Sequence, residues 1–232
     1  IAASLGDLTT LGLLSWIAEL LYDDLDKDKW LAPVIISGYV LFIPVCVYIA
    51  YRNEHTARVL LTGWTPVLVA MSISSLGGVI LDYAVTKFRG IAVFQPVMNG
   101  IGGNLVAVQA SRISTHLHSN SDLSSGQLPE SDATICIGPW ELFFGTNTHC
   151  RTSRILLLLV VPGHLIFTYT ISLLQAGHTT PTAAFLLAYC LAALIQVYIL
   201  LHVAHCLIHW MWTRSIDPDN SAIPYLTALG DL

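Results

Sequence analysis

The sequence predicts an all-α protein, a polytopic bundle of transmembrane helices, on three observations. Hydrophobic residues make up 54% of the 232 residues and charged residues only 11%, less than half the ~25% that is usual in soluble domains. The apolar residues fall into blocks that match the roughly 20 residues a helix needs to cross a bilayer. Polar turns separate these blocks. A soluble domain of this composition would expose large apolar patches, which excludes the soluble class.

Six spans are expected in order, followed by the start of a seventh. They cover residues 1–22, 32–51, 59–85, 90–115, 153–176 and 181–212, and the seventh begins near Ile223. An acidic loop (23–29) follows the first span, and a long polar loop (116–152) follows the fourth. Alternation of the loops puts six Lys and Arg residues on the side of the long loop and four on the other side. This bias favours the long loop as cytoplasmic.

The sequence Leu-Gly-Asp-Leu occurs twice, around Asp7 and around Asp231. Each copy puts a carboxylate into an apolar helix, where burial costs at least ~2.5–3.5 kcal/mol. No Lys or Arg lies inside a span, so the expected counter-charge is a mobile cation or a proton. The recurrence predicts two repeats of a transporter unit. Two facing carboxylates suit Mg²⁺, which prefers oxygen ligands. Pairing with a nearby Arg or capping of a helix stays open for each aspartate.

The fourth span, residues 90–115, is unusually polar for a membrane helix. It contains Pro96, several glycines, Asn99, Asn104 and Gln109. Irregular backbone at membrane depth is tolerated only where it is buried in protein or lines a wet cavity. We therefore expect Asn104 and Gln109 to offer neutral oxygens to a hydrated cation, with Asn99 as a further polar residue along its path. Tight helix packing at the glycines, with bonding between asparagines, is the alternative.

Two further acids near span ends carry weaker expectations. Asp82 is expected to cap a helix at the interface or to help an ion enter, and Glu19 is expected at the interface. Neither acid recurs in a matched context as Asp7 and Asp231 do. They are therefore not part of the predicted cation site.

Histidine and cysteine in the sixth span suggest a rival ligand set. His202, His205 and His209 are spaced to share one helix face beside Cys206, and imidazole with thiolate suits a transition metal. No acid accompanies them and two tryptophans follow, so interfacial histidines are the favoured interpretation. The long loop holds two further cysteines, at positions 136 and 150, which could pair in an oxidising compartment. No basic, aromatic-interleaved pattern indicates a nucleic-acid partner.

Three stretches carry a family resemblance: residues 96–112 (PVMNGIGGNLVAVQASR), residues 2–8 (AASLGDL), and residues 218–220 together with 223–232. They resemble the solute carrier 41 magnesium transporters, which are relatives of the bacterial MgtE magnesium channel. The resemblance covers essentially the whole chain. The Gly-Gly-Asn run is its most specific part.

The resemblance implies an MgtE-type five-helix unit plus preceding helices. The family is similar to a fusion of two such units, packed as a pseudo-dimer around one central pathway. Residues 1–22 would then be the last helix of the first unit, 23–58 an acidic loop and linker helix, and 59–232 a second unit truncated in its last helix. The chain is accordingly expected to be a fragment that lacks most of the first repeat, its intramolecular partner.

The resemblance also implies that Asp7 and Asp231 contact hydrated magnesium and that Asn104 lies in a pore-side helix. It puts the 116–152 loop in the cytosol. The expected function is transport of Mg²⁺ as substrate in the lipid bilayer, with no cofactor and no enzymatic activity, in the plasma membrane rather than a mitochondrial or other organelle membrane. Channel-like transport and sodium-coupled exchange (Na⁺ as second ion) both stay open. The alternatives are a zinc or other transition-metal transporter and a non-transporting scaffold or regulatory subunit.

Overall fold

The computed structural model of the chain describes residues 12–14, 16–17, 31–54, 56–57, 60, 63–88, 91–129, 134–174 and 182–232. The chain forms two compact units, residues 1–62 and 63–232. All regular structure in the described residues is helical, which confirms the predicted all-α class. Asp7 and Glu19 lie outside the described residues.

The first unit contains one long helix, α2 (Leu31–Arg52), of 22 residues. At ~1.5 Å per residue it is about 33 Å long, enough to cross a bilayer core. Its apolar side chains, for example Leu41 and Phe42, are exposed. It matches the predicted second span to within a residue at either end.

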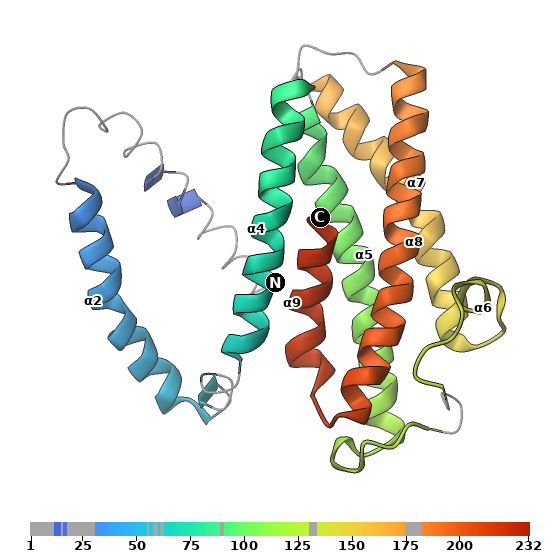
Figure 1. Ribbon diagram of the computed structural model, residues 1–232, viewed down its shortest axis with the longest axis horizontal. Coiled ribbons are helices and arrows are strands. Elements are labelled where there is room, and N and C mark those ends of the chain that lie inside the picture. The colour runs from blue at the N-terminus through green and yellow to red at the C-terminus, as the bar shows by residue number, and fades with distance from the viewer. Residues whose placement is uncertain are drawn as a thin grey trace. The chain divides into compact units, whose positions relative to one another are not determined.

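The second unit holds α4 to α9, which Figure 1 shows as a bundle. In chain order they are α4 (Trp64–Lys87), α5 (Ile91–Asn120), the 3₁₀ helix η1 (Leu123–Ser125), α6 (Pro139–Phe144), α7 (Thr148–Leu173), α8 (Ala183–Thr213) and α9 (Pro218–Gly230).

Local sequence signals explain where the last two helices begin. The Thr182 hydroxyl accepts a hydrogen bond of 3.4 Å from the Phe185 N–H and caps α8. The Asp217 carboxylate accepts one of 3.0 Å from the Asp219 N–H, and Pro218 takes the first position of α9. Only residues 214–217 join the two helices, so α9 turns back alongside α8 (Figure 1).

The fourth predicted span is a continuous helix rather than irregular backbone. α5 runs for 30 residues with Pro96 inside it. The Asn104 side chain donates a hydrogen bond of 2.7 Å to the Gly100 carbonyl one turn earlier. An added Cβ at Gly102 would touch the Gln196 side chain, and one at Gly103 would lie 3.8 Å from Thr227. The glycines therefore serve close helix packing, which was the alternative interpretation of this segment.

The long polar loop is shorter than predicted and contains two short helices. α5 continues to Asn120, and α7 begins at Thr148 instead of near 153. Two short helices, η1 and α6, lie between them. Within α6, Leu142 and Phe143 are buried whereas Trp140 and Phe144 are exposed. The segment between α5 and α7 is mostly polar, and α6 is too short to show a helical period. Hydrophobic periodicity therefore did not predict this helix.

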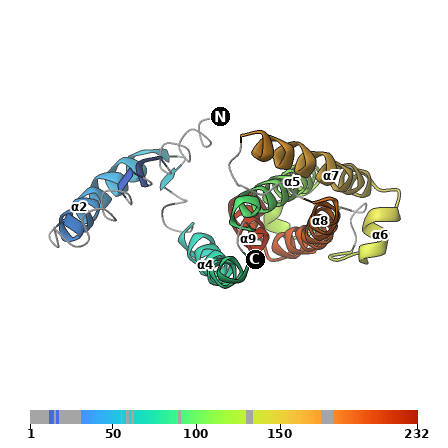
Figure 2. The ribbon, with the colours of Figure 1, turned by 90° about the horizontal axis from the view of Figure 1, so that it is seen from above.

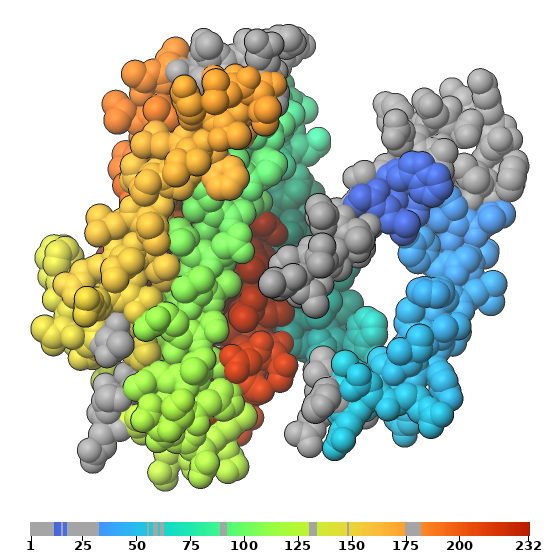
Figure 3. All heavy atoms as spheres, turned by 180° about the vertical axis from the view of Figure 1, so that it is seen from behind, coloured from blue at the N-terminus to red at the C-terminus, as the bar shows by residue number. Residues whose placement is uncertain are grey.

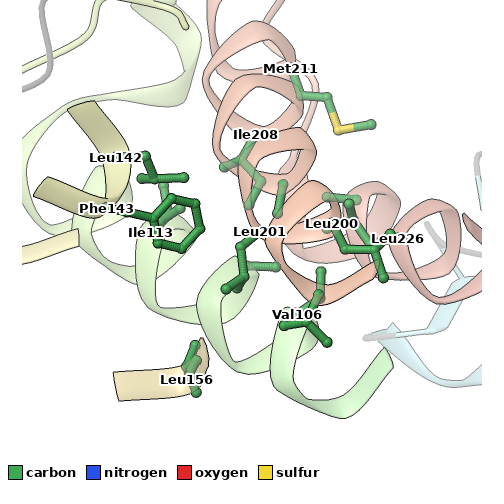
Figure 4. Close-up of a cluster of buried hydrophobic side chains, with 14 of the residues drawn as sticks. Val106, Ile113, Leu142, Phe143, Leu156, Leu200, Leu201, Ile208, Met211 and Leu226 are labelled. Carbon is green, nitrogen blue, oxygen red and sulfur yellow. The ribbon is translucent and has the colours of Figure 1, made fainter. Parts of the chain in front are cut away.

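The core of the second unit lies among α5, α7, α8 and α9. Figure 4 shows Val106 and Ile113 of α5 next to Leu201 and Ile208 of α8, with Leu226 of α9 at one side. All five are fully buried. Since lipid tails are as apolar as these side chains, dense packing rather than removal from water holds such a core together in a membrane.

Helix α9 lies between α4 and α5, as the views of Figures 1 and 2 show. In Figure 3 its red atoms separate the green of α5 from the teal of α4. α4 contacts the bundle mainly through α9. With 13 residues α9 is about 20 Å long. It begins at one end of the bundle, and its last residues lie beside the middle of α4 and α5 (Figure 1).

Four of the described helices are long and apolar enough to cross a membrane: Pro33–Arg52, Trp64–Lys87, His149–Leu173 and Ala183–Thr213. α5 has the length but a more polar sequence. Within the second unit, four described arginines lie towards the end where α9 begins, at positions 112, 151, 154 and 214, and Lys87 lies at the other end. The chain is a multi-pass membrane protein.

Candidate cation site

The carboxylate of Asp231 lies where α9 meets two other helices. The Ser74 hydroxyl, from α4, donates a hydrogen bond of 2.6 Å to Oδ2. The Asn99 amide, from α5, donates one of 3.0 Å to Oδ1. All three side chains are part-buried. The two oxygens of one carboxylate are therefore each held by a different helix.

Close backbone packing puts Asp231 in this position. A Cβ added at Gly77 of α4 would lie 2.5 Å from the backbone oxygen of Asp231 and 3.0 Å from its carbonyl carbon. Gly230 packs on α5 at ordinary van der Waals distance, because a Cβ there would lie 3.7 Å from the Gly103 backbone. The Gln196 amide of α8 also donates a hydrogen bond of 2.8 Å to the Gly230 carbonyl. Small residues on α4 and α5 thus let the end of α9 enter between them.

A second amide fixes the orientation of the first. Gln95 Nε2 donates a hydrogen bond of 3.0 Å to Asn99 Oδ1, one helical turn along α5. The Asn99 oxygen is then occupied, and its NH₂ group faces Asp231. Buried networks in which each member is satisfied hold a defined geometry. The donors around Asp231 are held in place before any ion arrives.

The charge of Asp231 has no counter-charge in the described residues. The ion pairs found there are those of His118 with Asp217, at 3.4 Å, and with Asp219, at 3.6 Å. Ser74 and Asn99 are neutral donors. An ionised carboxylate offers about four lone-pair positions, and these two bonds leave roughly half of them for a cation or its water.

The other predicted amides lie elsewhere on α5. Asn104 is exposed and bonds to its own helix. Gln109 is fully buried and donates hydrogen bonds to the Ser153 hydroxyl at 3.1 Å and to the His149 carbonyl at 3.4 Å, both on α7. Of the three amides, the structure brings only Asn99 to Asp231. A role for Asn104 and Gln109 in cation contact stays a prediction.

Sequence reasoning missed three of the residues that shape this site: Ser74, Gln95 and Gln196. Ser74 lies one turn before Gly77 and Gly78 on a small-residue face of α4. A hydroxyl on such a face is a usable signal, because small faces mark close helix contacts and the hydroxyl must bond across them. Asp82 is exposed on α4, two turns beyond Ser74.

The rival histidine set divides between two places. His205 and His209 of α8 lie with their ring centroids 4.2 Å apart, and the His149 ring of α7 is 6.5 Å from each. These three rings are at most 7% exposed, so they lie inside the bundle. The third member, His202, instead lies 3.8 Å from the sulfur of Cys206.

The disulfide differs from the suggested pairing. Cys136, in the segment before α6, is bonded to Cys206 of α8, with a Cα–Cα distance of 4.5 Å. Cys150 is free and buried, and its thiol points at the Glu141 carbonyl at 3.5 Å. Sequence proximity favoured Cys150 as the partner. The fold instead lays the segment before α6 against α8, 70 residues away along the chain.

Comparison with known proteins gives one family and a group of close relatives. The family model "MgtE: Divalent cation transporter" matches residues 95–232. Solute carrier family 41 member 2 of Mus musculus is 48% identical over 234 residues, covering 100% of this chain and 40% of that protein. Member 2 of Xenopus laevis is 50% identical over 234 residues, 100% of this chain and 41% of its own length.

Member 3 of Mus musculus is 44% identical over 235 residues, which is 100% of this chain and 47% of that protein. The chain therefore spans less than half the length of these relatives. No solved structure matches the chain significantly.

Proposed function

The chain belongs to the MgtE family of divalent cation transporters, as its resemblance to solute carrier family 41 predicted, and we propose that the protein containing it carries Mg²⁺ across a membrane. The observation that supports this is the carboxylate of Asp231. It lies about 20 Å along α9 from the end of the bundle, and only neutral donors hold it. A carboxylate at such a depth in the membrane, with no counter-charge beside it, is typical of an ion pathway.

The chemistry of the site suits a hydrated hard cation. Mg²⁺ dehydrates reluctantly and usually keeps several waters, so proteins bind it through one or two carboxylates. Asp231 would accept hydrogen bonds from those waters through the lone pairs that Ser74 and Asn99 leave free. Contacts through the waters of the hydrated ion bind it weakly enough for release, as transport requires.

Asp7 supplies the second carboxylate in this proposal. Its Leu-Gly-Asp-Leu sequence repeats that of Asp231, and the two repeats would each present one aspartate to a shared pathway. Two carboxylates together balance the charge of one divalent cation. The proposed pair of carboxylates does not require Asn104 or Gln109, and their predicted place along the pathway is tested separately by mutagenesis.

Mg²⁺ uptake or efflux in cells that express the full-length protein tests the proposal. We expect Asp231→Asn and Asp7→Asn each to lower the flux by about tenfold or more, which corresponds to ~1.4 kcal/mol or more in the barrier. Asp122→Asn, the same change on an exposed loop residue, serves as control and should leave the flux unchanged. Normal flux in the Asp231→Asn and Asp7→Asn variants at equal surface expression would refute the proposed site.

A transition metal is the rival cargo that the histidines of α8 suggest: the rings of His205 and His209 lie 4.2 Å apart, and His149 lies 6.5 Å from each, although their nitrogens do not form a set within 4.8 Å of one another. Imidazole nitrogens suit zinc better than magnesium. Competition of Zn²⁺ against Mg²⁺ in the flux assay separates the two. If Zn²⁺ is the cargo, His205→Gln lowers its transport and Mg²⁺ does not compete.

The proposal also includes exchange of Mg²⁺ against Na⁺ and a location in the plasma membrane. Imposing a Na⁺ gradient across liposomes that contain the purified full-length protein should drive Mg²⁺ the opposite way if the two are exchanged. Equal rates with and without the gradient indicate a channel-like mechanism. Passage of no divalent ion at all would favour the scaffold or regulatory interpretation.

A further inference from the structure

Three soft-metal ligands meet on the outer side of α8, away from the Asp231 site. Cys136, His202 and Cys206 each offer one ligand atom, and these atoms all lie within 4.8 Å of one another. His202 and Cys206 are one turn apart on α8, so they face the same way. Cys136 reaches them from the exposed segment before α6. In the structure the two sulfurs are joined as a disulfide.

The position of this disulfide is chemically unusual. Cys206 lies seven residues before the end of α8, towards the arginine-rich end of the second unit, which the positive-inside rule assigns to the cytoplasm. Disulfides rarely persist in the reducing cytosol, where a cluster of cysteines is more often a metal site. We propose that, when the disulfide is reduced, Cys136, His202 and Cys206 bind a zinc ion, and that oxidation of the two thiols releases it.

The geometry fits zinc with one small movement. Zinc–sulfur and zinc–nitrogen bonds of ~2.3 and ~2.0–2.1 Å at tetrahedral angles set S···N edges of roughly 3.6 Å and S···S edges of roughly 3.8 Å. The distance from Cys206 Sγ to His202 Nε2 is already 3.8 Å. The two sulfurs must separate by roughly 2 Å from their bonded distance, and the ligand atoms of Cys136 and His202 are already within 4.8 Å of each other. Cys136 lies outside any helix and is exposed, so its segment can make that movement.

The exchange between the two states balances. A cellular monothiol (RSH) reduces the disulfide: the S–S bond takes up two electrons and two protons, and two RSH become one RSSR. In the reverse step RSSR oxidises the two zinc-bound thiolates: their S–S bond forms again, the S–S bond of RSSR breaks to give two RS⁻ that take up protons, and Zn²⁺ is released. Binding of Zn²⁺ then releases the two thiol protons, because thiolates are the ligands. Two thiolates neutralise the charge of the ion. Three protein ligands leave the fourth position to water.

Both the disulfide and the proposed zinc ion connect the segment before α6 to α8. Phe143 of α6 already stacks on Tyr198 of α8, with ring centroids 4.5 Å apart, and Cys136 contacts the same helix eight residues further on. α8 also carries Gln196, which bonds the Gly230 carbonyl beside Asp231. The proposed zinc therefore joins a cytoplasmic segment to the helix that supports the cation site. It goes beyond the proposed function and does not depend on which ion is transported.

Zinc binding by the full-length protein in detergent tests this inference. The protein is stripped with a chelator, reduced with a phosphine or left oxidised, and titrated with Zn²⁺ against a chromophoric chelator. We expect the reduced protein to retain about one more Zn²⁺ per chain than the oxidised protein. Co²⁺ in place of Zn²⁺ should show thiolate-to-metal charge-transfer absorption only after reduction.

Variants separate this site from other ligands. His202→Gln leaves the disulfide intact and should abolish the extra zinc, as should Cys136→Ser. Cys190→Ser removes a free cysteine and should change nothing. Equal zinc in the two redox states, or extra zinc that survives both His202→Gln and Cys136→Ser, overturns the proposal. Zinc that is lost in His118→Gln and not in His202→Gln also overturns it, because it belongs to the exposed His118–Asp217–Asp219 cluster.

Discussion

Helix α5 presents an amide side chain to two different polar clusters, and the two clusters have opposite character. Asn99 donates to the carboxylate of Asp231 in a part-buried site between α4, α5 and α9. Gln109, ten residues and about 15 Å further along, donates to the neutral hydroxyl of Ser153 in a fully buried site against α7.

The difference between the clusters separates function from packing. A neutral hydrogen bond between two helices of a membrane protein stabilises the fold by ~0.6 kcal/mol on average. Burying a carboxylate without a counter-charge in a membrane costs free energy, and such residues are usually functional. The Asn99 cluster should therefore control the transported ion, and the Gln109 cluster should control the stability of the bundle. Variants that change both properties equally would remove this distinction.

The largest effect is expected where α4 touches the end of α9. Gly77→Ala puts a Cβ 2.5 Å from the backbone oxygen of Asp231. Backbone cannot yield as a flexible side chain does, so the helices must separate at a cost of about 3 kcal/mol or more. Loss of both Mg²⁺ flux and thermal stability should follow, measured by transport assay and by heating the detergent-purified protein.

Gly78→Ala is the matched control, since a Cβ at Gly78 meets nothing within 4 Å. It should behave as the wild type or be slightly more stable, because alanine is the better helix former. If Gly77→Ala matches Gly78→Ala, then α9 does not enter between α4 and α5 as the structure has it.

An intermediate effect is expected for the donors to Asp231. Asn99→Ala removes a hydrogen bond to a charged group, and such bonds contribute ~1.5–3 kcal/mol. We expect the Mg²⁺ concentration that gives half-maximal flux to rise by about tenfold, since ~1.4 kcal/mol is tenfold in an equilibrium constant. Ser74→Ala should act in the same direction. An unchanged concentration dependence in both variants would show that these donors do not shape the site.

The smallest effect is expected at the neutral cluster. Gln109→Met keeps the side-chain volume and removes the bonds to α7, while Ser153 keeps its own hydrogen bond of 3.0 Å to the His149 carbonyl. Stability should fall by ~0.5–1.5 kcal/mol, with no change in the Mg²⁺ dependence of the flux. Asn104→Ala, an exposed amide on the same helix, should change stability by less than ~0.5 kcal/mol.

The same pair of variants tests the two remaining sequence predictions. If Gln109→Met or Asn104→Ala shifts the Mg²⁺ dependence as strongly as Asn99→Ala does, then that residue lines the pathway. The boundary between the two clusters on α5 would then lie further along the helix. Equal surface expression must be shown for each variant before the fluxes are compared.

Much of the fold was predictable because lipid leaves few options. Apolar blocks of sufficient length must become helices in a bilayer, since every backbone polar group has to be satisfied within the segment. This fixed α2 to within one residue at each end. The same reasoning missed α6, whose short helix is stabilised by the burial of Leu142 and Phe143. It also gave the wrong backbone for α5, because proline and glycine weaken an isolated helix more than a packed one.

The candidate site was predictable in part for a related reason. Asp231 stood out because a carboxylate in an apolar block is rare, and its recurrence around Asp7 strengthened the signal. Asn99 was a secondary candidate among the amides of this span, after Asn104. Nothing in the order of residues distinguishes it from Gln109, since both lie on one helix and differ only in the helices they face.

By itself, then, the sequence determined that this protein is a helical membrane protein with a carboxylate inside an apolar segment. Those properties depend on composition and on local spacing, which a linear chain carries in full. Only the tertiary structure decided that Ser74 and Asn99 hold Asp231, that Gln109 bonds to α7, and that Cys136 joins Cys206 and not Cys150. These pairs are 40 to 157 residues apart. Their contacts depend on which helix faces pack together, which local sequence does not encode.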